Sequence, residues 1–137
     1  MKFHLGDILS ITTGRLVSNR HMDGVYDILN FMTGDNLFTH QLPRASLECA
    51  SFLKGQFPQL DTPEMDIAVS ELSEMLETPS GRAEPAELVA GWLAGQVAKY
   101  GEWFEVSPLP PGQHEVRNPI IEAEEMMGPE KVISVVI

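Results

Sequence analysis

The spacing of apolar residues between positions 22 and 32 constrains the fold of this chain more than any other feature. These residues recur at steps of three and four, at Met22, Val25, Ile28, Leu29 and Met32. Such spacing places all of them on one face of an α-helix. Ser18 or Asn19 can cap the start of the helix, and Gly34 can end it in the left-handed conformation. The segment therefore predicts an amphipathic helix packed on a core.

Three further helices are predicted between Pro43 and residue 100. Pro43 suits the first turn of a helix, because its missing N–H is not needed there, and this helix stops at Gly55. Thr62 supplies an N-cap hydroxyl for the next helix, in front of a proline and a glutamate. The last helix covers about 85–100, and we expect 78–85 before it to be a loop.

Two glycines, Gly91 and Gly95, lie four residues apart inside the helix predicted over 85–100. Each costs roughly 1 kcal/mol relative to alanine in a helix interior. We therefore expect them to allow a neighbouring element to approach closely.

Both ends of the chain are rich in β-branched residues. Residues 2–17 predict a strand and turn, with a hairpin centred on Thr13-Gly14, and 102–106 predicts another strand. An Asn-Pro start and a glycine end indicate a short acidic helix over 118–128, and 131–137 is an apolar run typical of a strand. The predicted fold is α+β: one domain, 1–137, in which a small sheet pairs the N- and C-terminal strands and packs against about four helices.

Length and composition limit the class of protein. With 137 residues, of which 43% are hydrophobic, the chain can bury an ordinary core without a metal or disulfide. Cys49 is the single cysteine, so Cys-rich zinc sites are excluded and the thiol is expected to be a buried apolar group. No signal peptide or membrane-spanning run is present, which favours a soluble cytoplasmic protein.

The charge of the chain is divided unequally along its length. Residues 1–57 hold five acidic and five basic residues, whereas 58–137 hold 15 acidic and four basic ones. The whole formal charge of −11 therefore belongs to the second part (4 − 15). Such a field repels nucleic acid and anionic membranes and attracts basic surfaces. We expect a protein partner with a basic surface and no direct contact with nucleic acid or membrane.

The candidate binding surface consists of acidic residues of the second part that have almost no basic residue at i+4. The residues are Glu64, Asp66, Glu71, Glu74, Glu77, Glu122, Glu124 and Glu125. Carboxylates gathered on one face could occupy a basic groove made for phosphates, so that the protein mimics nucleic acid. Carboxylates spread over all faces would indicate that they only keep the protein soluble.

A second candidate site lies in the polar stretch Thr12–Arg44. Arg15, Arg20, His21, Asp35, His40 and Arg44 could surround an anionic substrate of a small enzyme or ligand-binding protein. In that hypothesis His40 is a general acid or base oriented by Asp35, and Arg44 clamps the anion. A metal site from His21, Asp23, Asp35 and His40 has suitable donors, but no characteristic spacing supports it.

Catalytic motifs are absent from the sequence. It contains no G-x-S-x-G elbow and no glycine-rich phosphate loop. We therefore predict no catalytic residue, no metal and no cofactor, and we favour a binding protein over an enzyme.

Three runs resemble a family of small proteins encoded by tailed bacteriophages and prophages. They are LGDILSITTGRL (5–16), GVYDILNFMTGDNLFTHQLPRA (24–45), and GEWFEVSPLPPGQHE with NPIIEAEEMMGPEKVISVVI (101–137). That family has no assigned activity, so the resemblance transfers no site residue. It implies a phage accessory protein in the bacterial cytoplasm. By analogy with small acidic phage proteins, it suggests an inhibitor of host defence such as an anti-CRISPR protein. A homodimer paired through 131–137 is a further expectation.

Overall fold

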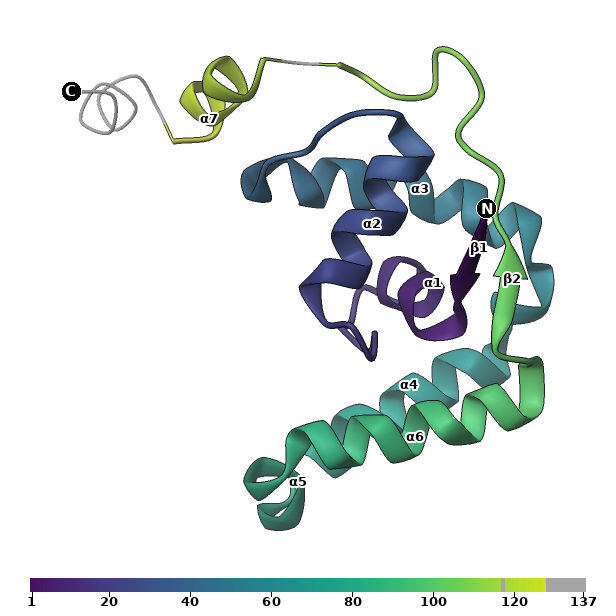
Figure 1. The fold of residues 1–137 in the computed structure, drawn as a ribbon. Helices are drawn as coiled ribbons and strands as arrows, with labels where there is room; N and C mark the ends of the chain where they lie inside the picture. Colours follow the sequence, from purple (N-terminus) through teal and green to yellow (C-terminus); the bar gives the residue numbers. More distant parts are fainter. Residues whose placement is uncertain (117, 128–137) are drawn as a thin grey trace.

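The computed structural model describes residues 1–116 and 118–127 of the chain (Figure 1). Within them lie seven α-helices, two short strands and two 3₁₀ turns. In chain order these are β1 (Lys2–His4), α1 (Leu5–Thr12), α2 (Met22–Thr33), η1 (Thr39–Gln41), α3 (Leu42–Gln56), η2 (Pro58–Leu60), α4 (Pro63–Leu76), α5 (Pro79–Ala83), α6 (Pro85–Tyr100), β2 (Trp103–Glu105) and α7 (Pro119–Met127). None of the helices in the described residues is both long and apolar enough to cross a membrane.

The predicted α+β fold is wrong, because the protein is mostly helical. Its one sheet in the described residues has two strands, β1 and β2, paired antiparallel with Phe3 opposite Phe104. The partner of the N-terminal strand is therefore 103–105, and the predicted strand 131–137 lies outside the described residues. A pair of three-residue strands cannot carry a layer of helices, so helix-on-helix packing forms the core.

The N-terminal hairpin predicted over 2–17 is also wrong. After the short strand β1, the chain turns into helix α1, and the ring Nδ1 of His4 accepts a hydrogen bond from the backbone N–H of Gly6 at 3.0 Å. Residues 5–11 are all buried, between α2 and α3. Burial on every side explains the error, because a fully buried short helix shows no polar face by which sequence could identify it.

The other predicted helices are confirmed, with one addition. The predictions over 22–32, 43–55, 85–100 and 118–128 correspond to α2, α3, α6 and α7, and the helix predicted to start after Thr62 corresponds to α4. The segment 78–85, expected to be a loop, contains α5, which Thr78 caps by accepting a hydrogen bond from the N–H of Gly81. The strand predicted at 102–106 is confirmed as β2.

Two bodies of helices are visible in the ribbon. α1, α2, α3 and the strand pair form the upper body, while α4, α5 and α6 form a helical hairpin below it (Figure 1). Leu9, Ile28 and Leu53 are among the fully buried side chains of the upper body. In the hairpin, the indole N–H of Trp92 donates to the carbonyl oxygen of Ala68 at 3.1 Å and ties α6 to α4.

A buried carboxylate joins α1, the following loop and α2. Asp7 is only 1% exposed, and it accepts hydrogen bonds from the Ser18 hydroxyl at 2.5 Å and from Arg20 Nη2 at 2.7 Å. A buried charge is costly unless it is paired and hydrogen-bonded, and these two donors meet that condition. Arg20 also donates to Asp27 on α2, so the loop between α1 and α2 is fixed to both helices.

Gly24 allows α2 to approach this carboxylate. A Cβ atom at Gly24 would lie 2.2 Å from Asp7 Oδ1 and 2.3 Å from Ser18 Oγ. Gly91 and Gly95 differ, because nothing lies within 4 Å of a Cβ atom built on either. The expectation that these two glycines admit a close neighbour is therefore wrong.

Gly24→Ala is expected to lower the free energy of unfolding by about 2 kcal/mol or more, because the methyl group displaces the donors of Asp7. Gly95→Ala is the matched control and should raise it by up to about 1 kcal/mol through helix propensity alone. Urea denaturation followed by circular dichroism measures both. Equal effects of the two substitutions would contradict the assigned role of Gly24.

Candidate functional site

Helix α4 presents the main acidic face of the described structure. Its buried side is formed by Met65 and Leu72. The 3.6-residue repeat places the predicted acidic residues on the other side, and all are exposed: Glu64, Asp66, Glu71, Glu74 and Glu77. Five of the eight acidic residues predicted as a surface are thus brought together on one helix.

The five carboxylates of α4 differ in their partners. At the margins, Glu64 pairs with Lys99 of α6 at 2.8 Å, and Glu77 pairs with Arg82 of α5 at 3.0 Å. Asp66, Glu71 and Glu74 form no ion pair with any residue that the structure describes. We call these three the central carboxylates of α4. Lys54 lines the same pocket as Asp66 but forms no ion pair with it, so the charge of the three carboxylates is not neutralised by a direct partner in the described structure.

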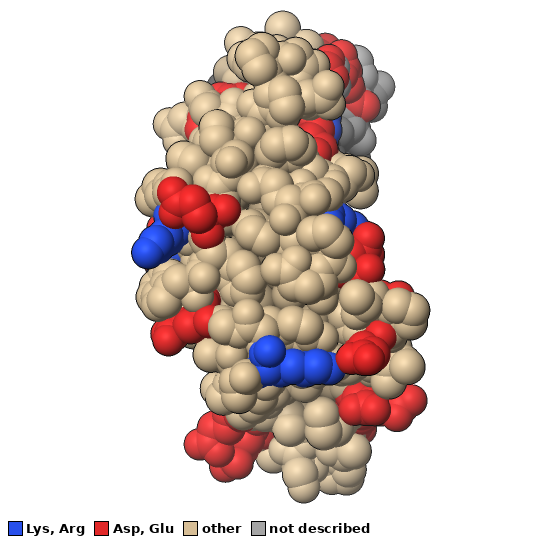
Figure 2. All heavy atoms as spheres, turned by 90° about the vertical axis from the view of Figure 1, so that its right-hand side faces the viewer, with Lys and Arg blue, Asp and Glu red and all other residues tan. Residues whose placement is uncertain are grey.

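Acidic side chains are spread unevenly over the face of the molecule that Figure 2 shows. On the face in Figure 2, red carboxylates lie in separate groups near the two edges, with neutral surface between them and a few basic side chains beside them. On this face the acidic residues form no continuous sheet of charge. On this face, carboxylates are therefore grouped in separate patches and do not form one broad acidic surface.

The other three predicted acidic residues lie on α7, at the opposite end of the molecule from α4 (Figure 1). Glu125 is exposed and Glu124 is half-buried. The side chain of Glu122 is only 4% exposed, and Arg44 binds it through two hydrogen bonds, Nε to Oε1 at 2.6 Å and Nη2 to Oε2 at 3.0 Å. Glu122 therefore belongs to an internal contact and not to the acidic surface.

The residues predicted to surround an anionic substrate fall into two groups. Arg20 binds Asp7 and Asp27 in the upper body, and His21 is exposed at the start of α2 with a positive φ of 55°. Arg15, in the same loop, forms no ion pair within the described residues. The second group, Asp35, His40 and Arg44, lies near α7.

The second group does bind an anion, but the anion is a side chain of the protein itself. Arg44 holds the carboxylate of Glu122, and the Gln41 amide donates to the same carboxylate at 2.8 Å. The hydrogen bond to Glu122 raises the pKa of Arg44. His40 Nε2 lies 2.7 Å from the carbonyl oxygen of Pro119 at the start of α7. The prediction that Arg44 clamps an anion thus describes an intramolecular contact.

A histidine that the sequence did not single out completes this region. His114 lies in the segment 108–114, and its ring nitrogens contact Glu48 Oε1 at 2.6 Å and Asp35 Oδ2 at 3.0 Å. The hydrogen bond from His114 lowers the pKa of Asp35. No sequence signal identifies this cluster, because His114 is 66 and 79 residues from its two partners.

The described residues do not form a metal centre. No group of three or more histidine, cysteine, aspartate or glutamate side chains in them is arranged to hold a metal ion. Of the four residues considered from sequence, His21 and Asp23 are exposed at the start of α2, while Asp35 is bound to His114. The donors therefore do not converge.

An apolar cleft of about 400 Å³ separates the two helical bodies. Leu16 and Val17 line it from the loop after α1, and Leu76, Val89 and Leu93 line it from the hairpin. No acidic residue, lysine or arginine lines it. Most of the lining is suited to apolar contact, and Ser18, Asn19 and His21 add polar groups at the end of the loop after α1.

Cys49 is fully buried on α3, as the sequence predicts. Burial raises the pKa of its thiol to about 12, with a further contribution from Glu48. At neutral pH the thiolate is therefore scarce, and the sulfur is shielded from reagents.

Cys49 is expected to react with a thiol reagent such as DTNB at least about 100-fold more slowly in the folded protein than in the protein unfolded by guanidinium. The release of thionitrobenzoate measures both rates. Similar rates in the two states would contradict the buried position of the thiol.

Arg44→Met is expected to weaken the docking of α7 by about 3 kcal/mol, because Glu122 loses its charge partner. Hydrogen exchange of the α7 amides measures this loss, and a double-mutant cycle with Glu122→Gln isolates the pair. Arg82→Met is the control, since it removes an exposed pair and should change little. Equal effects of the two arginine substitutions would contradict the assignment.

Comparison with known proteins gives one family match. The model of the family described as Domain of unknown function (DUF7736) matches residues 3–62, from β1 to just before α4. No curated protein and no solved structure matches the chain. The matched segment contains the three helices of the upper body but not its second strand, β2. It includes Arg44 and excludes both the acidic helix α4 and Glu122 of α7.

Proposed function

We propose that this protein acts by binding, and that the central carboxylates of α4 contact a basic surface of a protein partner. The observation that carries the proposal is that Asp66, Glu71 and Glu74 are exposed on one helix with no basic partner in the described structure. Unopposed charges of one sign attract a surface of opposite sign and accelerate association with it.

The partner class follows from charge and from the resemblance to small phage proteins. A bacterial defence or nucleic-acid-processing complex, such as a CRISPR surveillance complex, presents basic grooves that bind phosphates. Three carboxylates on one rigid helix face could take the place of phosphates in such a groove. Inhibition by mimicry of nucleic acid, in the bacterial cytoplasm, is the narrower form of the proposal.

The positions of the residues in Thr12–Arg44 give less support to the alternative function, a small enzyme that acts on an anionic substrate. Arg20 and Arg44, two of the three arginines assigned to that site, already bind carboxylates of the same chain. His40 contacts a backbone carbonyl, and the residues of the stretch lie in two separate groups. A binding protein therefore accounts better for the positions of these side chains.

The test compares two variants of equal net charge. Asp66→Asn, Glu71→Gln and Glu74→Gln together change the formal charge from −11 to −8 (−11 + 3). The control carries Asp23→Asn, Asp61→Asn and Glu124→Gln, which also gives −8 (−11 + 3) but leaves the central carboxylates in place. Binding to a purified CRISPR surveillance complex is measured by calorimetry at increasing salt.

We expect the α4 variant to bind at least about tenfold more weakly than wild type, and the control to bind nearly as wild type, because local charge governs contact. Affinity for wild type should fall as salt rises, since exposed charges are screened over about 8–10 Å at moderate ionic strength. Equal losses in the two variants, or binding independent of salt, would contradict the role of α4.

A further inference from the structure

The segment after β2 runs along α3 in the reverse direction. We call residues 107–116 and 118–125 the C-terminal strap. Ser107 exchanges hydrogen bonds with the side chain of Gln56 at the end of α3. The N–H of Glu115 then donates to Glu48 in the middle of α3 at 3.0 Å, and Glu122 binds Arg44 near its start. The strap therefore follows one side of α3 from its end to its beginning (Figure 1).

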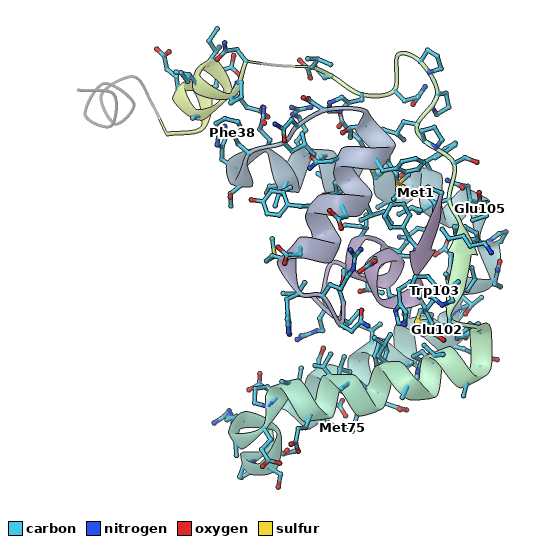
Figure 3. The ribbon with its side chains drawn as sticks, in the orientation of Figure 1. Met1, Phe38, Met75, Glu102, Trp103 and Glu105 are labelled. Carbon is cyan, nitrogen blue, oxygen red and sulfur yellow. The ribbon has the colours of Figure 1, made fainter. Side chains whose placement is uncertain are left out.

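The attachment of the strap beyond residue 112 is largely polar. Its large apolar side chains are exposed: Val116 by 76%, Ile120 by 59% and Ile121 by 54%. Phe38, which precedes η1, is also exposed and lies on the side of α7 (Figure 3). Since little apolar area holds this part of the strap, hydrogen bonds and ion pairs must hold it.

His114 can hold the strap against the rest of the protein in a way that depends on its protonation. Its side chain is only 6% exposed, and each ring nitrogen lies within hydrogen-bond distance of a carboxylate. An ionised carboxylate only accepts hydrogen bonds, so the two contacts are both hydrogen bonds only when each ring nitrogen carries a proton. In that protonated form the imidazole is a cation between Asp35, from the loop after α2, and Glu48, from α3.

We propose that the C-terminal strap is a pH-sensitive latch, closed when His114 is protonated and opened when it loses its proton. Asp35 and Glu48 contact this histidine, and five charged groups in all belong to the network of hydrogen bonds and ion pairs around it. They are Asp35 of the loop after α2, Arg44 and Glu48 of α3, and Glu115 and Glu122 of the strap. Four are carboxylates and one is a guanidinium, so loss of the His114 proton changes the net formal charge of the group, His114 included, from −2 to −3.

The direction of the pH dependence follows from the surroundings of His114. Burial lowers the pKa of His114, but the hydrogen bonds to Asp35 and Glu48 outweigh it, and the net pKa is raised above 6.5. A raised pKa means that the contribution of His114 is fully present below 6.5 and is lost as pH rises through the pKa of the folded state. Asp35, whose pKa is lowered, contributes above 3.8 and loses its contribution in acid.

Opening of the latch would change which groups the protein offers to solvent. Gln41, now buried, and Arg44 would lose the carboxylate of Glu122. The planar guanidinium of Arg44 would then be free to bind a carboxylate from another molecule. This consequence does not depend on the binding role of α4, which lies at the other end of the molecule (Figure 1).

The experiment follows the latch by NMR of the whole chain between pH 6 and pH 9. The His114 ring shifts report its protonation, and hydrogen exchange at the Glu115 amide, corrected for the intrinsic rate at each pH, reports closure. We expect protection of this amide to fall at least about tenfold as His114 deprotonates, while the amides of Leu9 and Leu53 in the core keep theirs. Equal protection of the Glu115 amide at pH 6 and pH 9 would overturn the proposal. A parallel loss of protection at the Leu9 and Leu53 amides would overturn it as well.

Two histidine variants separate the latch from general alkaline loosening. His114→Gln should show at pH 6 the low Glu115 protection that wild type shows at pH 9, and little further change with pH. His21→Gln is the matched control, because His21 is exposed and forms no contact with the strap. In this control, protection of the Glu115 amide should depend on pH as it does in the wild type. A His114→Gln variant that retained this dependence would overturn the proposal.

Discussion

The burial of Asp7 inside a helical core is the constraint on which the rest of the fold depends. Because α1 is covered on all sides, its carboxylate cannot reach bulk water and must find donors within the chain. Ser18 and Arg20 supply them, which fixes the loop after α1 over the helix. Arg20 then reaches Asp27 on α2, and α2 can approach only because Gly24 has no side chain.

The same rule, that a buried charge needs a partner, decides what the arginines can do. Arg20 and Arg44 each hold a nearly buried carboxylate, Asp7 and Glu122, and each joins segments distant in sequence. An arginine used in this way is not available to a substrate while the contact persists. The polar density of Thr12–Arg44, which suggests a site for an anion, is therefore explained mainly by intramolecular pairing.

Sequence patterns predicted those elements whose signals are local. α2, α3, α4 and α6 each have apolar spacing within their own residues, and these four helices are confirmed. The cap predicted at Thr62 for α4 is confirmed, whereas the cap predicted at Ser18 or Asn19 for α2 is wrong, because α2 starts after His21 without a side-chain cap. The helix α1 was not predicted, because its helical structure depends on burial between α2 and α3. In addition, Ile8 and Ile11 favour a strand by propensity. The contacts of His114 and Glu122 connect residues 66–81 positions apart, and no pattern within one segment encodes them. The spacing on α4 did predict an acidic face.

The charged residues at the two ends of the molecule are arranged in opposite ways. Around α3 and the C-terminal strap, carboxylates meet Arg44 and His114 and hold the chain together. On α4, only the carboxylates at the margins have basic partners, which are Lys99 of α6 and Arg82 of α5. The central carboxylates of α4 are exposed to solvent without such a partner. Because the helical core lies between them (Figure 1) and salt screens charge over about 8 Å, titration of His114 should leave the field at α4 almost unchanged. The recognition proposed for α4 and the closure proposed for the strap can therefore be tested independently of each other.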